Sequence, residues 1–514
     1  MRSSSRVSIE SVSELQHPGP AAPGLARGRF LVVSDRLPVA LTRDGGGGWR
    51  AAPAHGALTS ALTPVLGDRR DVWIGWPGVT EEEVPGLRKV LAGAIQEGGC
   101  SLRPVMLTEE EKRLCYGGFS GEVIWPLFHD QPLECSFSHA YWQACCKVNR
   151  KFARMVAKTV AASGSGADLV WVHDALLIGL ASELRRLEAP ARTAFFLHLP
   201  FPSPDIFSKL PWRTQILERL LDYDQIGFQT ERDLANFLIC VRALLPGATA
   251  SRSEDGLWTV SGAASETRAG AFPIGIDFAG FAERAARPEV EARRAALRQS
   301  LRGRKLVLGV DRLDRSNGIP EKLRAFAELL TRHPELREQV SLVQVVVPSR
   351  ESLPRHAILR AEVERLVGEI NGYFSRPGWV PVHYLHRSLD PEELLAYYRA
   401  ADVALITPLK AGMGLTAKEY CAADREERGV LVLSEFAGAA PQLSCGALLV
   451  NPFDTRETAR TLRRALRMKS EERGARMRRL RREVAQHNVF WWAGTFLASL
   501  LGRWPRTGAR DLPS

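Results

Sequence analysis

The feature that most constrains this fold is a series of short apolar runs, each followed by a helix-like pattern. Runs of Val, Ile and Leu without polar alternation are typical of strands buried on both faces of a parallel sheet. The first series of expected strands covers 29–35, 71–76, 167–174, 192–200 and 224–230. The second covers 305–312, 340–348, 381–386, 402–408, 429–435 and 446–452. Helix patterns such as 321–333 and 391–401 fill the intervals, so the sequence predicts repeated βαβ units.

The two strand series meet near 271–281, which predicts an α/β fold of two doubly wound, Rossmann-like domains facing across a cleft. A chain of 514 residues is too long for one ordinary core. The expected parts are a flexible tail (1–28), an N-terminal Rossmann-like domain (29–272), a C-terminal Rossmann-like domain (273–485), a helix crossing back to the first domain (486–505) and a second tail (506–514).

Composition excludes several classes of protein. The apolar share of 45% and the charged share of 25% are those of a globular protein, and no apolar run reaches membrane-spanning length. The 8 cysteines show no metal-ligand spacing, so we expect reduced thiols, no metal and a cytoplasmic setting. Much of the net charge of +11 comes from arginines in 459–482. Since no nucleic-acid recognition motif accompanies them, we interpret this run as solvated helix faces.

Charged residues follow several of the expected strands, where ligands of open α/β sheets bind. Arg36, Arg312 and Arg350 each stand at or just beyond a strand end. A guanidinium matches phosphate oxygens in pairs, so this pattern predicts a phosphate site. Asp174 ends a buried strand, where a carboxylate needs a hydrogen-bonding partner. His198 ends another strand, and its residue type alone fits a structural role as well as a functional one.

A second anion site is predicted in the stretch PLKAGMGLTAKEY, residues 408–420. It leads from an expected strand into a helix, and its glycines allow the backbone to approach a ligand closely. The N–H groups from Gly412 to Leu415, with Met413 and Gly414 between them, form a candidate diphosphate cradle. Glu419, one helical turn further on, is a candidate acceptor for ribose hydroxyls.

Three aromatic residues, Trp76, Tyr116 and Trp125, stand near expected polar turns. Residues of this type pack in cores more often than they contact ligands, but three together could form a platform for a sugar ring. Gly56 opens an expected helix after a glycine-rich loop. These residues are therefore candidates beside the charged ones.

The sequence resembles the trehalose-6-phosphate synthase family, whose members are retaining glycosyltransferases of the GT-B fold. The resemblance extends from about Phe30 to Trp492. Its most specific segments are YGGFSGEVIWPLFH, FFLHLPFPSPDIFSKLPWR, LLDYDQIGFQTERD, INGYFSRPGWVPVHYLHRSL and VLVLSEFAGAA. The resemblance implies transfer of glucose from a nucleotide-sugar to glucose 6-phosphate, that is, trehalose biosynthesis.

Site roles follow from the resemblance by position. On the acceptor side it implies that the sugar phosphate is held by Arg36, Tyr116, Trp125 and Arg350, with Trp76 beside them and Asp174 on the sugar. On the donor side it implies contacts from Gly56, His198, Arg312, Met413, Leu415 and Glu419. Asp174, His198 and Arg312 are the residues expected at the reacting groups. The usual proposal for such transfer needs no protein nucleophile and no cofactor, and positioning with charge stabilisation does most of the work.

The sequence departs from the family pattern at several places. The family's SNR reads SDR at 34–36, its paired glycines read His55–Gly56, and its HDYHL reads HDALL at 173–177. The more serious departures are on the donor side. Asn317 stands where a lysine is expected on the diphosphate, Ala411 replaces an acid, and Gly414 replaces an asparagine. Loss of one group that stabilises a leaving group typically costs about a hundredfold or more in rate. Arg315 and Lys410 are cations close enough in sequence to compensate.

Three interpretations therefore remain open. The leading one is a working trehalose-6-phosphate synthase. The second is a relative with a changed donor or acceptor, such as a glucosylglycerol-phosphate synthase or a pseudo-glycosyltransferase. The third is a catalytically inactive paralogue that binds sugar phosphate. All three imply small-molecule ligands and neither nucleic acid nor membrane; the resemblance also admits a homo-oligomer.

Overall fold

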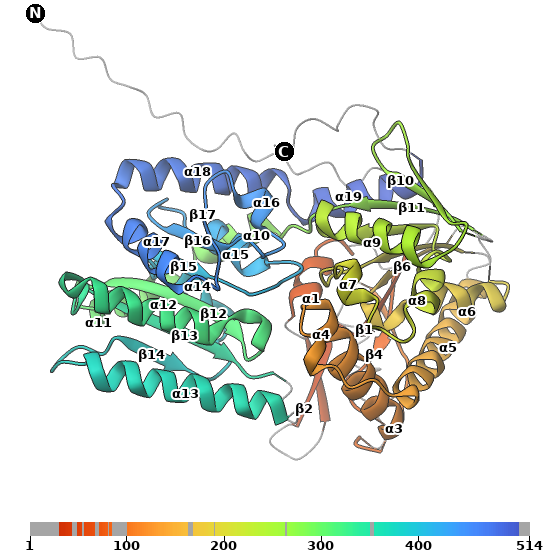
Figure 1. Ribbon diagram of the computed structural model, residues 1–514, viewed down its shortest axis with the longest axis horizontal. Coiled ribbons are helices and arrows are strands. Elements are labelled where there is room, and N and C mark those ends of the chain that lie inside the picture. The colour runs from red at the N-terminus through yellow and green to blue at the C-terminus, as the bar shows by residue number, and fades with distance from the viewer. Residues whose placement is uncertain are drawn as a thin grey trace, which may run out of the picture.

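The structure is a computed structural model that describes residues 30–43, 49–53, 56–66, 71–80, 82–84, 100–162, 168–189, 191–262, 265–349 and 354–502. The expected tails at 1–28 and 506–514 lie outside these residues, as does Arg350. Two lobes lie side by side, each built on its own sheet (Figure 1). We call residues 30–271 with the C-terminal helix the first lobe, and residues 278–486 the second lobe.

The first lobe contains a 9-stranded sheet in the order β5-β4-β1-β6-β7-β8-β11-β10-β9. Its strands are β1 (Phe30–Arg36), β4 (Val72–Trp76), β5 (Ser101–Pro104), β6 (Leu169–His173), β7 (Arg192–Phe196), β8 (Gln225–Phe228), β9 (Thr249–Arg252), β10 (Trp258–Ser261) and β11 (Glu266–Ala271). Neighbouring strands from β5 to β11 are parallel, whereas β10 is antiparallel to both β11 and β9.

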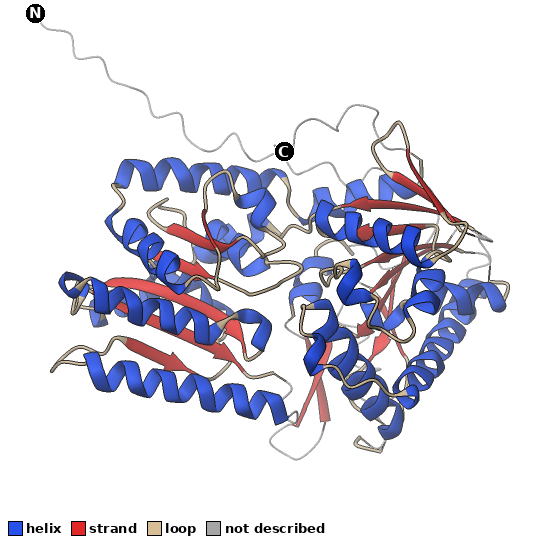
Figure 2. Ribbon diagram, in the orientation of Figure 1, coloured by secondary structure: helices blue, strands red, loops and turns tan. Residues whose placement is uncertain are grey.

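Figure 2 shows the helices in blue and the strands in red. The helices of the first lobe lie between these strands in the sequence. They are α1 (Ala57–Leu62), α3 (Glu109–Glu111), the π-helical segment η2 (Lys112–Ile124), α4 (Trp125–Phe128), η3 (Pro132–Glu134), α5 (His139–Ala161), η4 (Ala175–Leu177), α6 (Leu180–Arg186), α7 (Pro204–Phe207), α8 (Arg213–Leu220) and α9 (Glu231–Leu244). A separate hairpin joins β2 (Val39–Arg43) to β3 (Trp49–Pro53).

The second lobe has a 6-stranded parallel sheet in the order β14-β13-β12-β15-β16-β17. Its strands are β12 (Lys305–Arg312), β13 (Val340–Val347), β14 (Val382–Leu385), β15 (Val403–Ile406), β16 (Val430–Ser434) and β17 (Leu448–Val450). Its helices are α10 (Phe278–Ala285), α11 (Pro288–Ser300), η5 (Arg315–Asn317), α12 (Ile319–Arg332), η6 (Pro334–Leu336), α13 (Pro354–Phe374), α14 (Pro391–Ala400), α15 (Leu415–Ala423), α16 (Ala440–Leu443), α17 (Thr455–Arg467) and α18 (Ser470–Gln486).

Burial explains why these segments are strands. In β12, Leu306 and Leu308 belong to one hydrophobic cluster and Val307 to another, because successive strand residues point to opposite faces. The expected α/β fold of two Rossmann-like domains is confirmed. The expected strand at 192–200 is shorter in the structure and ends at Phe196, four residues before Pro200. The antiparallel β9–β10 hairpin was not predicted.

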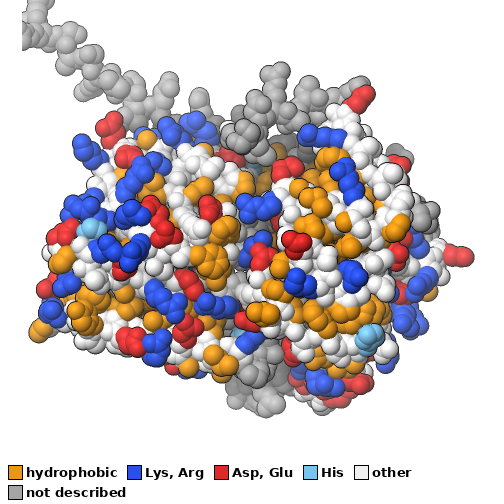
Figure 3. All heavy atoms as spheres, viewed as in Figure 1, with side chains coloured by type: hydrophobic (Ala, Val, Ile, Leu, Met, Phe, Trp, Pro, Cys, Tyr) orange, Lys and Arg blue, Asp and Glu red, His pale blue; other side chains and the backbone are white. Residues whose placement is uncertain are grey.

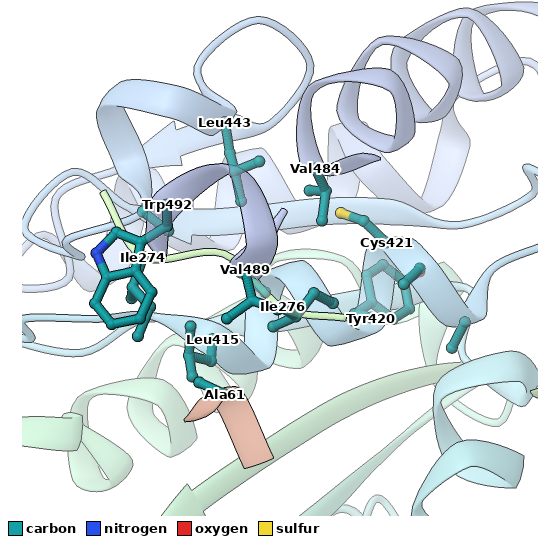
Figure 4. Packing of buried hydrophobic residues seen from close by; sticks show 14 of the residues in the cluster. Ala61, Ile274, Ile276, Leu415, Tyr420, Cys421, Leu443, Val484, Val489 and Trp492 are labelled. Carbon is teal, nitrogen blue, oxygen red and sulfur yellow. The ribbon is translucent and has the colours of Figure 1, made fainter. Parts of the chain in front are cut away.

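The chain crosses between the lobes twice, and the crossings pack together. The first crossing is 272–277; the second joins α18 to α19 (Val489–Leu500), where Val489 N donates to Ile276 O at 3.0 Å. A Cβ on Gly275 would lie 2.3 Å from the carbonyl carbon of Asn488, so only glycine permits this approach. Figure 4 shows the buried side chains here, with Ala61 from the first lobe, Leu415 from the second and Val489 in one cluster.

Helix α19 belongs to the first lobe in space although it follows the second in sequence (Figure 1). Its Trp492 packs on Trp171 of β6, with ring centroids 5.0 Å apart. Gln225 of β8 donates from Nε2 to Phe496 O at 2.8 Å and accepts from Ser499 Oγ at 3.0 Å. The end of the chain therefore anchors the second lobe to the first.

The basic run at 459–482 lies on α17 and α18, where arginines pair with acidic neighbours. Arg460 contacts Glu457 at 2.8 Å, and Arg478 contacts Glu427 at 3.0 Å. Acidic side chains are interspersed with the basic ones over this face (Figure 3). Among the described residues, no helix is long and apolar enough to cross a membrane.

Candidate functional site

The first part of the site is a stack of three side chains at the end of β1. The Arg36 guanidinium lies 4.5 Å from the ring centroid of Trp76 and 5.9 Å from that of Tyr116. The two rings are 4.4 Å apart, and Tyr116 donates from its hydroxyl to Asp35 O at 2.6 Å. Trp76 is only 1% exposed, so it supports the guanidinium and has almost no free face for a sugar. This stack leaves an exposed cation on a rigid aromatic base.

Asp174 lies close to this stack, just beyond the end of β6. Burial raises the pKa of Tyr116 well above its ordinary value, and the nearby charges of Asp35 and Asp174 raise it further. Asp174 also has a φ of 87°, a backbone conformation that is costly for a residue with a Cβ. Such strain persists where the surrounding structure holds it, and it often marks functional positions.

Tyr116 and Trp125 were expected near polar turns, and the structure places them within a helical stretch. Tyr116 lies within the π-helical segment η2, and Trp125 begins α4, so both belong to one continuous helical stretch. The glycines at 117, 118 and 121 suggested a turn in the sequence. In the structure Gly118 permits close packing instead, since a Cβ there would lie 2.4 Å from the Tyr141 ring.

Trp125 is the point at which the two lobes' site residues meet. The Arg312 guanidinium, at the end of β12, lies 5.0 Å from the Trp125 ring centroid. The His129 ring also stacks on Trp125, with ring centroids 4.2 Å apart. Burial lowers the pKa of His129 to about 4, so this imidazole is neutral at pH 7 and adds no positive charge beside Arg312.

The loop after β15 is the second part of the site. A Cβ on Gly412 would lie 2.0 Å from the carbonyl oxygen of His198, so this position packs directly against the first lobe. Gly414 has a φ of 66° and caps α15 without a side-chain hydrogen bond. The first N–H groups of α15 therefore have no side-chain acceptor and suit an anion. Leu415 itself is buried, so its backbone is the part available to a ligand.

His198 belongs to a buried pair of histidines. Its Nε2 lies 3.0 Å from Nδ1 of His173, and its Nδ1 lies 3.5 Å from Nε2 of Gln229. Burial lowers the pKa of His198 to about 3, and it lowers that of His173 as well. Both rings are therefore neutral at pH 7 and act through hydrogen bonds and backbone rather than through charge.

Glu419 lies on α15, five residues beyond the capping glycine. The hydroxyl of Tyr398 donates to its Oε2 at 3.0 Å. Burial raises the pKa of this carboxyl, while the Tyr398 hydrogen bond and the charge of Arg284 oppose the rise. One carboxylate oxygen is thus fixed by Tyr398, which orients the group.

The donor-side substitutions have defined partners. Asn317 donates from Nδ2 to the carbonyl oxygen of Arg312 at 2.9 Å, so its amide braces the turn and carries no charge. Arg315 pairs with Glu321 at 2.6 Å, and Lys410 pairs with Asp130 at 2.8 Å. Neither cation that could replace the expected lysine is unpaired in this structure.

The remaining candidates stand as follows. Gly56 is exposed and begins α1, whose Ala61 lies in the same hydrophobic cluster as Leu415. Met413 is half-buried against that cluster. All 8 cysteines are free thiols, and no group of three His, Cys, Asp or Glu that could hold a metal occurs among the described residues.

Sequence reasoning missed three features of the site. It did not identify His129 beneath Trp125, the partner of Lys410, or the buried amine of Lys418 on α15. The Lys410–Asp130 pair joins residues 280 positions apart, and a local sequence pattern cannot predict such a contact. His129 follows Trp125 by four residues, and this helical spacing was the available signal.

Comparison with known proteins gives consistent results. The sequence profile described as glycosyltransferase family 20 matches residues 28–501. A trehalose-6-phosphate synthase from Mycobacterium leprae (strain TN) is 42% identical over 478 residues, which cover 92% of this chain and 94% of that protein.

Solved structures agree with this match. An alpha,alpha-trehalose-phosphate synthase (UDP-forming) from Burkholderia xenovorans, in complex with glucose-6-phosphate, superposes with a TM-score of 0.83 at 33% identity and covers 92% of this chain and 100% of its own. A structure named trehalose-6-phosphate from E. coli, bound with UDP-2-fluoro glucose, gives 0.81 at 34% identity and covers 92% and 99%. The match extends over both lobes.

Proposed function

The chain belongs to glycosyltransferase family 20, and on that premise we propose that it is a trehalose-6-phosphate synthase. It transfers glucose from a nucleotide-sugar to the anomeric carbon of glucose 6-phosphate with retention. The solved neighbours are named as UDP-forming or are bound with a UDP-sugar, so UDP-glucose is the donor that we propose.

One observation carries this proposal: the contact of Arg312 with Trp125 across the two lobes. It brings a cation at the end of a second-lobe strand next to the helix that carries the acceptor-side aromatics. A sugar phosphate beside Arg36 and a diphosphate beside Arg312 would then lie close together. This is the arrangement that a transfer between two anionic substrates requires.

The residues have distinct roles in the proposed reaction. Arg36, with Arg350, binds the acceptor phosphate, and Asp174 accepts a hydrogen bond from the acceptor sugar. Arg312 and the N–H groups of 412–415 bind the donor diphosphate, and Glu419 accepts hydrogen bonds from the ribose. His198, neutral and braced by His173, positions the donor sugar through hydrogen bonding.

The reaction balances without a protein nucleophile. The anomeric oxygen of glucose 6-phosphate attacks C1 of the donor glucose from the face that the diphosphate leaves. The C1–O bond to the diphosphate breaks, and the departing phosphate oxygen takes the proton of the attacking hydroxyl. Arg312 stabilises the negative charge that develops on the leaving group. We propose that no cofactor takes part and that the free thiols suit the cytoplasm.

The test is release of UDP from UDP-glucose, measured with and without glucose 6-phosphate. We expect release only when the sugar phosphate is present, together with formation of trehalose 6-phosphate. Absence of release with UDP-, ADP- and GDP-glucose alike would contradict a working transferase.

A second candidate, a transferase with a changed donor or acceptor, is favoured by Ala411 alone. That position lacks the carboxylate that would accept hydrogen bonds from glucose hydroxyls, and a missing polar contact weakens discrimination between sugars. A screen of donors and acceptors separates the candidates. If glucose nucleotides fail while another donor turns over, the second candidate replaces the first.

A further inference from the structure

An ion pair joins the donor loop to the opposite lobe. Nζ of Lys410 lies 2.8 Å from Oδ2 of Asp130. Lys410 stands two positions before Gly412, and Asp130 stands two beyond the end of α4, the helix that begins at Trp125. The Lys410 side chain is 14% exposed and that of Asp130 is 42% exposed. The lysine half of the pair is therefore largely withdrawn from water.

The backbone fixes both ends of the pair. Leu409 N and Lys410 N donate to Ser316 O at 2.7 Å and 3.3 Å, which ties the donor loop to the turn that carries Asn317. Asp130 has a φ of 58°, a left-handed conformation that Asp tolerates better than most residues. Its N–H donates to Leu127 O at 3.3 Å. Each charge is thus presented from a constrained position.

The surroundings of Lys410 are acidic and belong to the first lobe. Burial raises the pKa of Asp233, and the nearby charge of Lys410 opposes this rise. With Asp130 bound directly and Asp233 near, the ammonium is compensated by carboxylates rather than left available for a phosphate. Two cations of the second lobe contact this part of the first lobe: Arg312 contacts Trp125 at the start of α4, and Lys410 contacts Asp130, two residues beyond its end.

We propose that Lys410 and Asp130 are positioning residues, whose pair holds the donor loop 408–414 against the His198 turn in the closed arrangement of the lobes. The inference rests on the proposed function. Separation of the lobes breaks the pair, so the pair adds to the stability of the closed state. A protein that is closed for a smaller fraction of the time has a weaker apparent affinity for its donor, while the chemistry of the closed state is unchanged.

The variants Asp130→Asn, Lys410→Gln and the exchange Asp130→Lys/Lys410→Glu test this proposal. Each single variant should raise KM for UDP-glucose by about three- to tenfold with kcat within about twofold. The double variant Asp130→Lys/Lys410→Glu is compared with a further reference variant, Asp130→Lys alone, and should reverse most of the rise in KM seen in that variant. That reference matters because a lysine at φ 58° is strained in both proteins.

A readout without substrate separates this inference from the proposed function. In the ligand-free protein, the amide hydrogens of 408–414 should exchange with solvent faster in Asp130→Asn and Lys410→Gln than in the unchanged protein. In the double variant Asp130→Lys/Lys410→Glu their exchange should be slower than in these two single variants. This result is expected even if the protein turns out to transfer another sugar or none. If none of the three variants changes the amide hydrogen exchange rate of 408–414, the inference is overturned.

A direct role of Lys410 on the diphosphate predicts a different pattern. UDP binding, measured by calorimetry, would then fall in every protein lacking Lys410, and the exchange variant would not restore it. That outcome would also overturn the inference. The control is Arg365→Glu/Glu369→Arg, an exposed pair at 2.5 Å within α13, which should leave KM and amide exchange of 408–414 unchanged.

Discussion

The acceptor edge and the donor edge of this site are assembled in different ways. On the acceptor edge, Arg36, Trp76 and Tyr116 contact one another within the first lobe. On the donor edge, Arg312 rests on Trp125 and Gly412 on His198, and both contacts cross between the lobes. The first-lobe part of the acceptor edge therefore keeps its contacts when the lobes separate, whereas these donor-edge contacts exist only when the lobes are together.

This comparison gives meaning to the departures from the family pattern. Asn317, Ala411 and Gly414 all lie on the edge that depends on closure. The Lys410–Asp130 pair lies on the same edge and joins the two lobes.

The largest effect is expected from Arg312→Met on the donor edge. It removes the cation that we propose stabilises the leaving diphosphate, and also its contact with Trp125. We expect kcat to fall by about a hundredfold or more, since the lost interaction strengthens in the transition state. Steady-state kinetics with UDP-glucose and glucose 6-phosphate measure this.

Arg315→Gln is the matched control for that change. Arg315 lies three residues further along but is bound to Glu321, so its loss should alter kcat by less than about threefold. Equal losses in the two variants would show that Arg312 is not distinguished from its neighbour and would remove the main support for the donor edge.

On the acceptor edge, Arg36→Met should raise KM for glucose 6-phosphate by about ten- to a hundredfold, because hydrogen bonds to charged groups are strong. The KM for UDP-glucose should change little, since Arg36 has its aromatic contacts within the first lobe. Kinetics with each substrate varied in turn provide the measurement. A parallel rise in both constants would break the distinction between an edge assembled within one lobe and a closure-dependent edge.

The same distinction explains which parts of the molecule the sequence could predict. Strand ends are local, so the positions of Arg36, Asp174 and Arg312 at the ends of buried runs were predictable from periodicity. The glycines of 412 and 414 were predictable as a close approach, because only backbone geometry is involved. What approaches Gly412, the carbonyl of His198, comes from another lobe and was not predictable.

Side-chain burial and helix type were harder to predict. Trp76 was predictable as an aromatic residue at a strand end. Its side chain is only 1% exposed because Arg36 and Tyr116, from other segments of the chain, pack on it. Tyr116 was expected near a turn because glycines usually mark turns, whereas here Tyr116 lies in a π-helical segment in which Gly118 permits tight packing. The Arg350 assignment stays a prediction, since it lies outside the described residues.

A smaller gain is expected from restoring the donor edge with Asn317→Lys/Ala411→Asp. The lysine adds a cation beside the leaving group, and the acid adds an acceptor for glucose hydroxyls. We expect kcat with UDP-glucose to rise by about tenfold, less than the loss in Arg312→Met, because Asn317 now braces the Arg312 carbonyl. The two single variants are the controls, and no gain in any of the three would favour a repurposed site over a weakened one.

The smallest effect concerns Lys418, which ties the donor helix to the first crossing between the lobes. It is buried, and its Nζ donates to Ile274 O at 2.6 Å and to Gln442 Oε1. Burial lowers the pKa of this amine from 10.5 to about 7. Between about pH 7 and pH 10.5 this amine is therefore more fully protonated in the unfolded chain than in the folded protein.

The sign of the pH effect follows from that difference. The contribution of Lys418 to the free energy of unfolding rises with pH from about 7 to about 10, by at most about 1.4 kcal/mol per pH unit, and is constant below that window. In Lys418→Met this rise is absent, so the stability difference between the protein and the variant should shift in favour of the protein between pH 7 and pH 9. Urea unfolding at pH 6, 7.5 and 9 measures the difference. A difference independent of pH would mean that the amine remains charged when folded, and the donor helix would then be held to the crossing by an ammonium ion rather than by a neutral donor.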